Sequence, residues 1–307
     1  MATPTELTKT LAMLPMKQRN AMLDGVFYDV GSLAAEEVGG LSPLVDREGS
    51  IVVVPPSGTG RPIRHYRKAL RFMNAEGDSI RAIAVAGVGS SVLGTAALAR
   101  NVADATGFDV AGIVTGYGLT DLLTEALGGW FVFGVADRMR LAVEQTVERS
   151  TSTLPQAAAP AVVEDGGEGV RAESAMGLNG LQAPGMPGGY DIATLVDILM
   201  ARPARLELIV GHSKGSLMID FVLEQFVEEL EGDQHPLFEA LEVVTFGAVV
   251  ALPPQFRRVR QYLGALDWFG GMNSRLHLPH QRLAGAWHHL NRKLPYHLDA
   301  VSVLSAR

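Results

Sequence analysis

The chain has 307 residues, of which 47% are hydrophobic and 19% charged, so it holds ample apolar material for one or two folded domains. With 26 Lys and Arg against 33 Asp and Glu, the net charge is −7 and the pI is about 5.6, which excludes the basic surface expected of a nucleic-acid-binding protein. No cysteine occurs, so disulfides, thiolate metal sites and a thiol nucleophile are excluded.

The first 23 residues predict an amphipathic helix rather than a secretory signal. Glu6, Lys9, Lys17 and Arg19 are spread through this stretch. A signal peptide would instead gather its positive charge ahead of a continuous apolar run. Nowhere does the sequence approach the roughly 18 to 20 uninterrupted apolar residues that span a bilayer. We therefore expect a cytoplasmic protein.

The pattern of apolar residues predicts an α/β fold. From residue 79 on, short apolar runs alternate with helical stretches, as in a mostly parallel sheet with helices on both faces. The strands are expected at 50–54, 80–86, 109–115, 206–210, 242–246, 262–266 and 282–287, and the helices at 62–73, 92–105, 191–201, 216–230 and 298–304. We expect a helical arm with the first strand or strands at 1–78, and an α/β core at 79–307.

An insertion interrupts this core at 116–190. Its first part is predicted to be helical and to expose the apolar cluster Trp130, Phe131, Val132 and Phe133. Its second part is rich in Ala, Gly and Pro, a composition that does not bury enough surface to hold one conformation. Long segments of this kind are often lids or functional loops, so we expect a lid-like insertion that packs over a site or docks on an apolar surface.

The motif with the clearest chemical meaning is Gly211-His212-Ser213-Lys214-Gly215. It is a G-x-S-x-G sequence placed directly after a predicted strand and directly before a predicted helix. A nucleophile elbow needs this context, because the turn is tight and flanking glycines avoid clashes with the strand and helix. We predict that Ser213 is a nucleophile and that the backbone N–H of Lys214 belongs to an oxyanion hole.

With this motif, residues 79–307 resemble the α/β-hydrolase superfamily, and lipases and esterases in particular. The resemblance implies a second oxyanion donor in the loop after an earlier strand. Here the glycine-rich turn that follows residue 86 matches that place, with Val88 or Gly89 as the donor. A dinucleotide site is disfavoured, because Val92 stands where the glycine fingerprint requires a glycine.

The resemblance also implies an acid and a base in the order serine, acid, histidine. Asp267 ends the apolar run 262–266 and is the predicted acid, with a simple helix N-cap as the alternative. His288 is the predicted base, since it is the first histidine after the expected last strand. The alternatives for the base remain open, and they are His280, His289 and His297.

These residues predict a serine hydrolase that cleaves carboxylic esters of apolar acyl groups through a Ser-His-Asp triad, with no cofactor and no metal. The segment 245–248 (TFGA) also resembles a lipase segment and favours lipid-like esters. We expect a small-molecule or lipid-like ester as partner, with contact to an apolar surface as a further option and no nucleic acid. The alternatives are an acyltransferase or thioesterase with the same triad, or a non-catalytic binding protein of the same fold.

Overall fold

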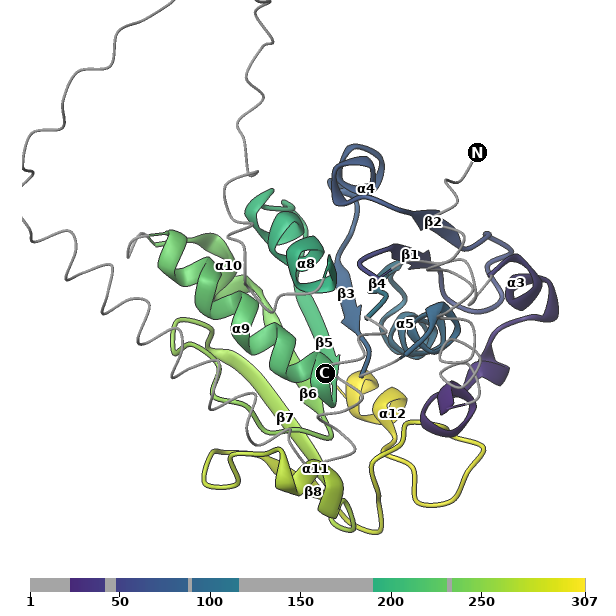
Figure 1. The fold of residues 1–307 in the computed structure, drawn as a ribbon, viewed down its shortest axis with the longest axis vertical. Coiled ribbons are helices and arrows are strands. Elements are labelled where there is room, and N and C mark those ends of the chain that lie inside the picture. Colours follow the sequence, from purple (N-terminus) through teal and green to yellow (C-terminus); the bar gives the residue numbers. More distant parts are fainter. Residues whose placement is uncertain (1–22, 42–47, 88–89, 116–189, 231–233, 307) are drawn as a thin grey trace, which may run out of the picture. The chain divides into compact units, whose positions relative to one another are not determined.

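The computed structural model describes residues 23–41, 48–87, 90–115, 190–230 and 234–306 (Figure 1). All of these residues belong to one compact unit. The N-terminal helix expected over 1–23 and the insertion expected at 116–190 lie outside the described residues, except for their last residues. The apolar cluster at 130–133 also lies outside them.

The described residues form an α/β fold around one eight-stranded sheet. Its order is β2-β1-β4-β3-β5-β6-β7-β8, and β1 runs antiparallel to both β2 and β4, while the other neighbours are parallel. The strands are β1 (Ile51–Val54), β2 (Arg64–Tyr66), β3 (Ala82–Val85), β4 (Val110–Ile113), β5 (Leu208–His212), β6 (Glu242–Phe246), β7 (Arg258–Gly264) and β8 (Gln281–Leu283). The expected α/β class with a mostly parallel sheet is therefore confirmed.

Helices cover both faces of the sheet, and the period-two alternation of the strands divides the core between them (Figure 1). In β1, for example, Val52 and Val54 pack on one face, and Ile51 and Val53 pack on the other. The first face is covered by α5 (Val92–Thr106) and α12 (Ala300–Ser305), and the second by α4 (Ala69–Glu76), α8 (Tyr190–Met200), α9 (Lys214–Glu229) and α10 (Pro236–Ala240).

Four further helical stretches lie in the described residues. They are residues 23–27, η1 (Val30–Ser32), α3 (Ala35–Gly40) and α11 (Trp268–Met272). No helix in the part of the chain that the structure describes is long and apolar enough to cross a membrane.

The helix expected over 62–73 is wrong in its first half. Residues 64–66 form the edge strand β2, which pairs with β1, and α4 begins only at Ala69. Side-chain contacts stabilise this arrangement, since the Arg64 guanidinium pairs with Glu76 and Asp109, and the Tyr66 hydroxyl donates to Glu76. Pairing between distant segments here overrides the local helical pattern.

Two strands near the C-terminus also differ from expectation. Strand β7 begins at Arg258, four residues before the apolar run, because Arg260 pairs with Glu242 on β6 and Gln261 bonds to the loop after β6. Strand β8 ends at Leu283 instead of residue 287, and the chain then turns at Gly285, whose φ is 67°. Strands β1 and β2, which precede residue 78, belong to the same sheet as the later strands.

The connections that leave β3 and β5 go to opposite faces of the sheet. Strand β3 leads into α5, which packs on the first face, whereas its neighbour β5 leads into α9, which packs on the second. Adjacent parallel strands whose connections diverge in this way form a switch point, and ligands of open α/β sheets bind at the carboxyl ends of such strands. Ser213, directly after β5, lies at this switch point.

Gly215 allows the start of α9 to approach β3 closely. A Cβ atom there would overlap the carbonyl oxygens of Val85 and Ala86, which are backbone atoms of the central sheet. We predict that Gly215→Ala lowers the free energy of unfolding by about 1–3 kcal/mol through overpacking. The control is Gly39→Ala in α3, where a Cβ would meet nothing within 4 Å. This variant should gain up to about 1 kcal/mol of unfolding free energy, because alanine favours a helix over glycine. Urea unfolding followed by circular dichroism measures both, and equal stability of the two variants would contradict the prediction.

Candidate active site

Ser213 is the single residue between β5 and α9, and its backbone is strained. Its φ and ψ are 53° and −122°, in a region that non-glycine residues rarely occupy. Strain of this kind costs about 1–3 kcal/mol and persists only where the surroundings impose it. Here the Ser213 N–H donates to the carbonyl of Phe246 on β6 at 2.8 Å. The strand-turn-helix context expected for the elbow is therefore present, and the serine hydroxyl projects at the carboxyl end of the sheet.

His288 and Asp267 extend from Ser213 as a chain of hydrogen bonds. His288 Nε2 lies 3.0 Å from Ser213 Oγ, and His288 Nδ1 lies 2.8 Å from Asp267 Oδ2. Both His288 and Asp267 are buried, whereas Ser213 is partly exposed. Because a carboxylate only accepts hydrogen bonds, Nδ1 carries the proton and Nε2 is free to accept the hydrogen of the serine hydroxyl.

Asp267 has a second partner that fixes its carboxylate. It is the N-cap of α11, and its Oδ1 accepts a hydrogen bond from the Gly270 N–H at 2.6 Å. The residue expected as the acid is thus also the N-cap that was the alternative. Its Oδ1 caps α11, and its Oδ2 contacts His288. This second bond orients Oδ2 toward His288.

Two glycines make room for the imidazole and the carboxylate. Gly247, the first residue after β6, has a φ of 68°, and a Cβ there would lie 2.9 Å from Cε1 of His288. At Gly270 a Cβ would overlap Asp267 Oδ2 and the carbonyl oxygen of Gly247. Any larger side chain at either position would displace part of the hydrogen-bonded chain.

The other histidines that the sequence left open lie elsewhere. His280 Nδ1 bonds to the carbonyl of Leu278, and His297 Nδ1 to that of Leu294. His289 is buried, but its Nε2 bonds to the carbonyl of Pro295. Among the described residues, His288 is the histidine that contacts both Ser213 and Asp267.

The surroundings of Ser213 restrict which N–H groups can stabilise an oxyanion. Lys214 is the first residue of α9 and directly follows Ser213, the place from which the residue after a nucleophile supplies an oxyanion donor. Gly87 lies beside Ser213, since a Cβ on it would be 3.3 Å from the serine Cβ, but its N–H already donates to the Tyr28 hydroxyl at 2.7 Å. Val88 and Gly89, the expected second donors, lie outside the described residues.

The sequence reasoning missed two buried residues of the N-terminal segment that reach this site. The Tyr28 hydroxyl lies 2.8 Å from His212 Nδ1, and the Asp24 carboxylate accepts hydrogen bonds from the Ser90 hydroxyl and the Ser91 N–H. No motif marks either residue, and both precede Ser213 by more than 180 positions. The local sequence offers only one sign of their role, which is that a tyrosine and an aspartate lie on a segment with an apolar face.

Burial shifts the pKa of two groups next to the site. Burial, and after it the nearby His288, lowers the pKa of His212 to about 3, so this ring is neutral at physiological pH. Burial raises the pKa of Asp24 to about 6, although hydrogen bonds from Ser91 and Ser90 oppose the shift. The residue before Ser213 is therefore a neutral histidine, and the residues after β3 bond to a carboxylate that is costly to ionise.

Among the described residues, no group of three or more His, Asp and Glu side chains is placed to hold a metal ion. Comparisons of the chain with protein-family models, with curated proteins and with solved structures give no match. The interpretation of the site therefore depends on its geometry and chemistry.

The raised pKa of Asp24 predicts a pH dependence of stability. Its ordinary value is 3.8 and its folded value about 6, so between these values the unfolded chain ionises while the folded protein keeps the proton. This contribution to stability is full below about pH 4 and is lost as the pH rises through about 6. Relative to Asp24→Asn, wild type should lose about 2 kcal/mol of unfolding free energy between about pH 4.5 and 7. Urea unfolding of both proteins at several pH values measures this difference. If the unfolding free energies of the two proteins changed in parallel with pH, the prediction would be contradicted.

Proposed function

We propose that this chain is a serine hydrolase of the α/β-hydrolase type, which cleaves carboxylic esters of apolar acyl groups. The observation that carries the proposal is the hydrogen-bonded chain from Ser213 through His288 to Asp267, with distances of 3.0 and 2.8 Å, at a strained strand-to-helix turn. A partly exposed hydroxyl, a buried imidazole and a buried carboxylate in this order are the parts that nucleophilic acyl transfer requires.

The geometry supports a two-step reaction. His288 Nε2 accepts the proton of the Ser213 hydroxyl as Oγ attacks the ester carbonyl, and Asp267 stabilises the imidazolium that forms. The imidazolium then gives its proton to the leaving alcohol, which yields an acyl-serine. Water, deprotonated by the same histidine, attacks the acyl carbonyl, and the acid and the free serine are released. None of these steps uses a cofactor.

The oxyanion of each tetrahedral intermediate needs two donors near Ser213. The N–H of Lys214, at the first position of α9, is one of them in this proposal. Val88 or Gly89 supplies the second, as expected from the sequence. The engagement of the Gly87 N–H by Tyr28 supports this choice, because it removes the nearest competing donor.

The places of the three residues along the sheet support the superfamily resemblance. Ser213 follows β5, Asp267 follows β7, and His288 follows β8, in the order serine, acid, histidine. The strands β3, β5, β6, β7 and β8 are consecutive neighbours and parallel, so their carboxyl ends meet at one edge. The lid expected at 116–190 belongs to the same proposal, and it enters the chain after β4 at that edge.

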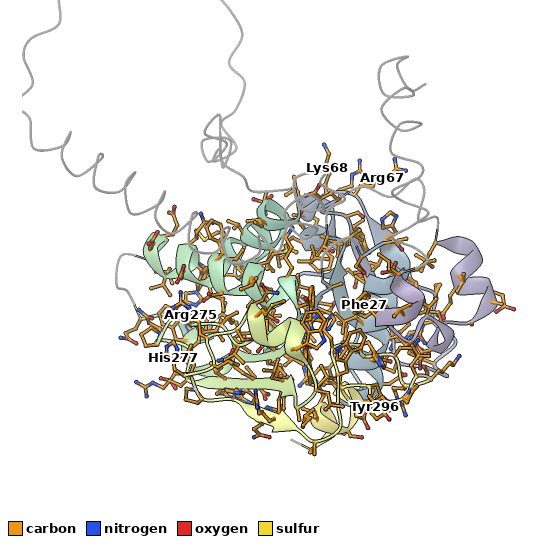
Figure 2. The ribbon with its side chains drawn as sticks, turned by 60° about the horizontal axis from the view of Figure 1, so that its bottom comes forward. Phe27, Arg67, Lys68, Arg275, His277 and Tyr296 are labelled. Carbon is orange, nitrogen blue, oxygen red and sulfur yellow. The ribbon has the colours of Figure 1, made fainter. Side chains whose placement is uncertain are left out.

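The surroundings of His288 favour an apolar acyl group. The rings of Phe269 and Phe27 meet the imidazole edge-on, with centroids 4.9 and 6.0 Å away. Figure 2 shows Phe27 near the middle of the face that is turned forward there. Four of the large exposed apolar side chains lie within nine positions of Asp267 in the chain, which are Leu266, Trp268, Met272 and Leu276. Aromatic rings against the base and exposed apolar residues near the acid in the chain suit a ligand with an apolar part.

A serine-directed phosphonate and a series of esters test the proposal. The wild type should be labelled at Ser213, and kcat/KM for p-nitrophenyl esters should rise with acyl length, since each buried methylene adds about 0.8 kcal/mol. Ser213→Ala should fold but lose labelling and turnover. The control is Ser79→Ala, which removes an exposed hydroxyl that bonds to the Glu76 carbonyl and should behave as wild type. Failure of the wild type to react with the phosphonate would contradict the proposal.

Asp267→Asn tests the role of the acid. An amide in place of the carboxylate can favour the wrong imidazole tautomer and provides no charge for the imidazolium, so kcat should fall by up to about 10⁴-fold by analogy with other triads. Steady-state kinetics measure the loss. The control is Asp299→Asn, which changes the N-cap of α12 and should leave kcat unchanged. If Asp267→Asn kept the wild-type kcat, the acid of this proposal would be misassigned.

A further inference from the structure

We propose that Tyr28 and His212 are positioning residues, which form a buried hydrogen-bond relay between the loop after β3 and the main chain of His288. The relay has three bonds. The Gly87 N–H donates to the Tyr28 oxygen at 2.7 Å, the Tyr28 hydroxyl meets His212 Nδ1 at 2.8 Å, and His212 Nε2 meets the His288 carbonyl oxygen at 2.9 Å. The inference rests on the proposed function, because positioning has meaning only if His288 acts on Ser213.

The chemistry of the partners allows one arrangement of protons. The His288 carbonyl only accepts, so Nε2 of His212 carries the hydrogen. In a neutral imidazole Nδ1 then accepts, and the Tyr28 hydroxyl must donate to it. The Tyr28 oxygen is left to accept from the Gly87 N–H. Each donor thus has one acceptor, and reversing any bond would leave a buried polar group without a partner.

The surroundings keep both side chains in the protonation states that this arrangement needs. His212 and Tyr28 are buried, and burial lowers the pKa of His212 and raises that of Tyr28. A protonated His212 would point an N–H at the Tyr28 oxygen, and the tyrosine hydrogen would lose its acceptor. His212 therefore stays neutral, and the three hydrogen bonds keep these directions, over the whole physiological pH range.

The relay joins the loop after β3 to the segment after β8, two strands that are not neighbours in the sheet. Gly87 follows β3, and its carbonyl also accepts from the Thr115 hydroxyl after β4 at 2.7 Å. On the other side, the Leu290 N–H donates to the Phe27 carbonyl at 2.8 Å, and the Asn291 side chain donates to the Gly25 carbonyl at 2.6 Å. The N-terminal segment is therefore bonded both to the loop after β3 and to the segment after β8.

A small shift of His212 would move both Ser213 and His288, because His212 is bonded to both residues. It directly precedes Ser213 and holds the backbone of His288, whose imidazole also lies against the His212 ring with centroids 5.0 Å apart. Loss of the relay would let His288 and the Gly87 loop move relative to Ser213. Misplacement of about 1 Å can cost about 100-fold in rate, so the relay acts on kcat rather than on binding.

Tyr28→Phe tests the relay in the full-length protein, since it removes one hydroxyl and leaves the Gly87 N–H and His212 Nδ1 without the partner they have in the wild type. We expect kcat and the rate of Ser213 phosphonylation to fall about 10- to 100-fold, with KM within about twofold of wild type. The control is Tyr66→Phe, which removes a hydroxyl that donates to Glu76 at 2.7 Å on the edge strand β2. This variant should keep the wild-type kcat. Equal kcat in Tyr28→Phe and wild type would overturn the proposal.

A second measurement does not depend on turnover. Nitrogen-15 NMR of the wild-type imidazoles should show His212 as the neutral Nε2–H tautomer, without titration from about pH 4.5 to 8. The downfield Nδ1–H signal of His288 should shift in Tyr28→Phe and stay in place in Tyr66→Phe. A His212 that titrates in this range, or carries its hydrogen on Nδ1, would overturn the relay. Failure of the proposed function would appear separately, as a wild type inert to esters and phosphonate whose His212 still shows the expected tautomer.

Discussion

The positive φ of Ser213 is the constraint on which the surrounding structure depends. A serine holds φ 53° only if neighbouring backbone prevents relaxation, and here β6 accepts its N–H while α9 begins at the next residue. Gly215 then brings α9 against the carbonyls of β3. The strained turn, the close helix and the central strands are one packing unit, so the hydroxyl is held at the carboxyl edge by the sheet itself.

Polar groups around this turn are satisfied by segments far apart in the sequence. The Asp267 carboxylate divides its oxygens between α11 and His288, and His212 divides its nitrogens between Tyr28 and the His288 carbonyl. Buried groups that share partners in this way couple the positions of their segments. The loop after β3, the elbow and the segment after β8 therefore hold one another in place.

The balance of charge and apolar surface at the site follows from the same packing. Burial keeps His212 neutral, and the Phe27 and Phe269 rings shield the imidazole of His288. In such surroundings the Asp267 carboxylate is the nearest charge to His288, and electrostatic interactions are stronger than in water. This environment suits a histidine that gains and returns a proton within each turnover of the proposed reaction.

Local sequence patterns were enough for the α/β class, most strands of the sheet and the strand-turn-helix element around Ser213, because apolar periodicity and the glycines at 211 and 215 act over a few residues. They also singled out Asp267 and placed His288 first among several histidines. The remaining features depend on the tertiary structure. Only the folded sheet brings His288 between Ser213 and Asp267, pairs β2 with β1, and bonds Tyr28 and Asp24 to the residues after β3. These outcomes depend on hydrogen bonds between residues far apart in the chain, and no local pattern encodes which distant partner will satisfy a buried polar group.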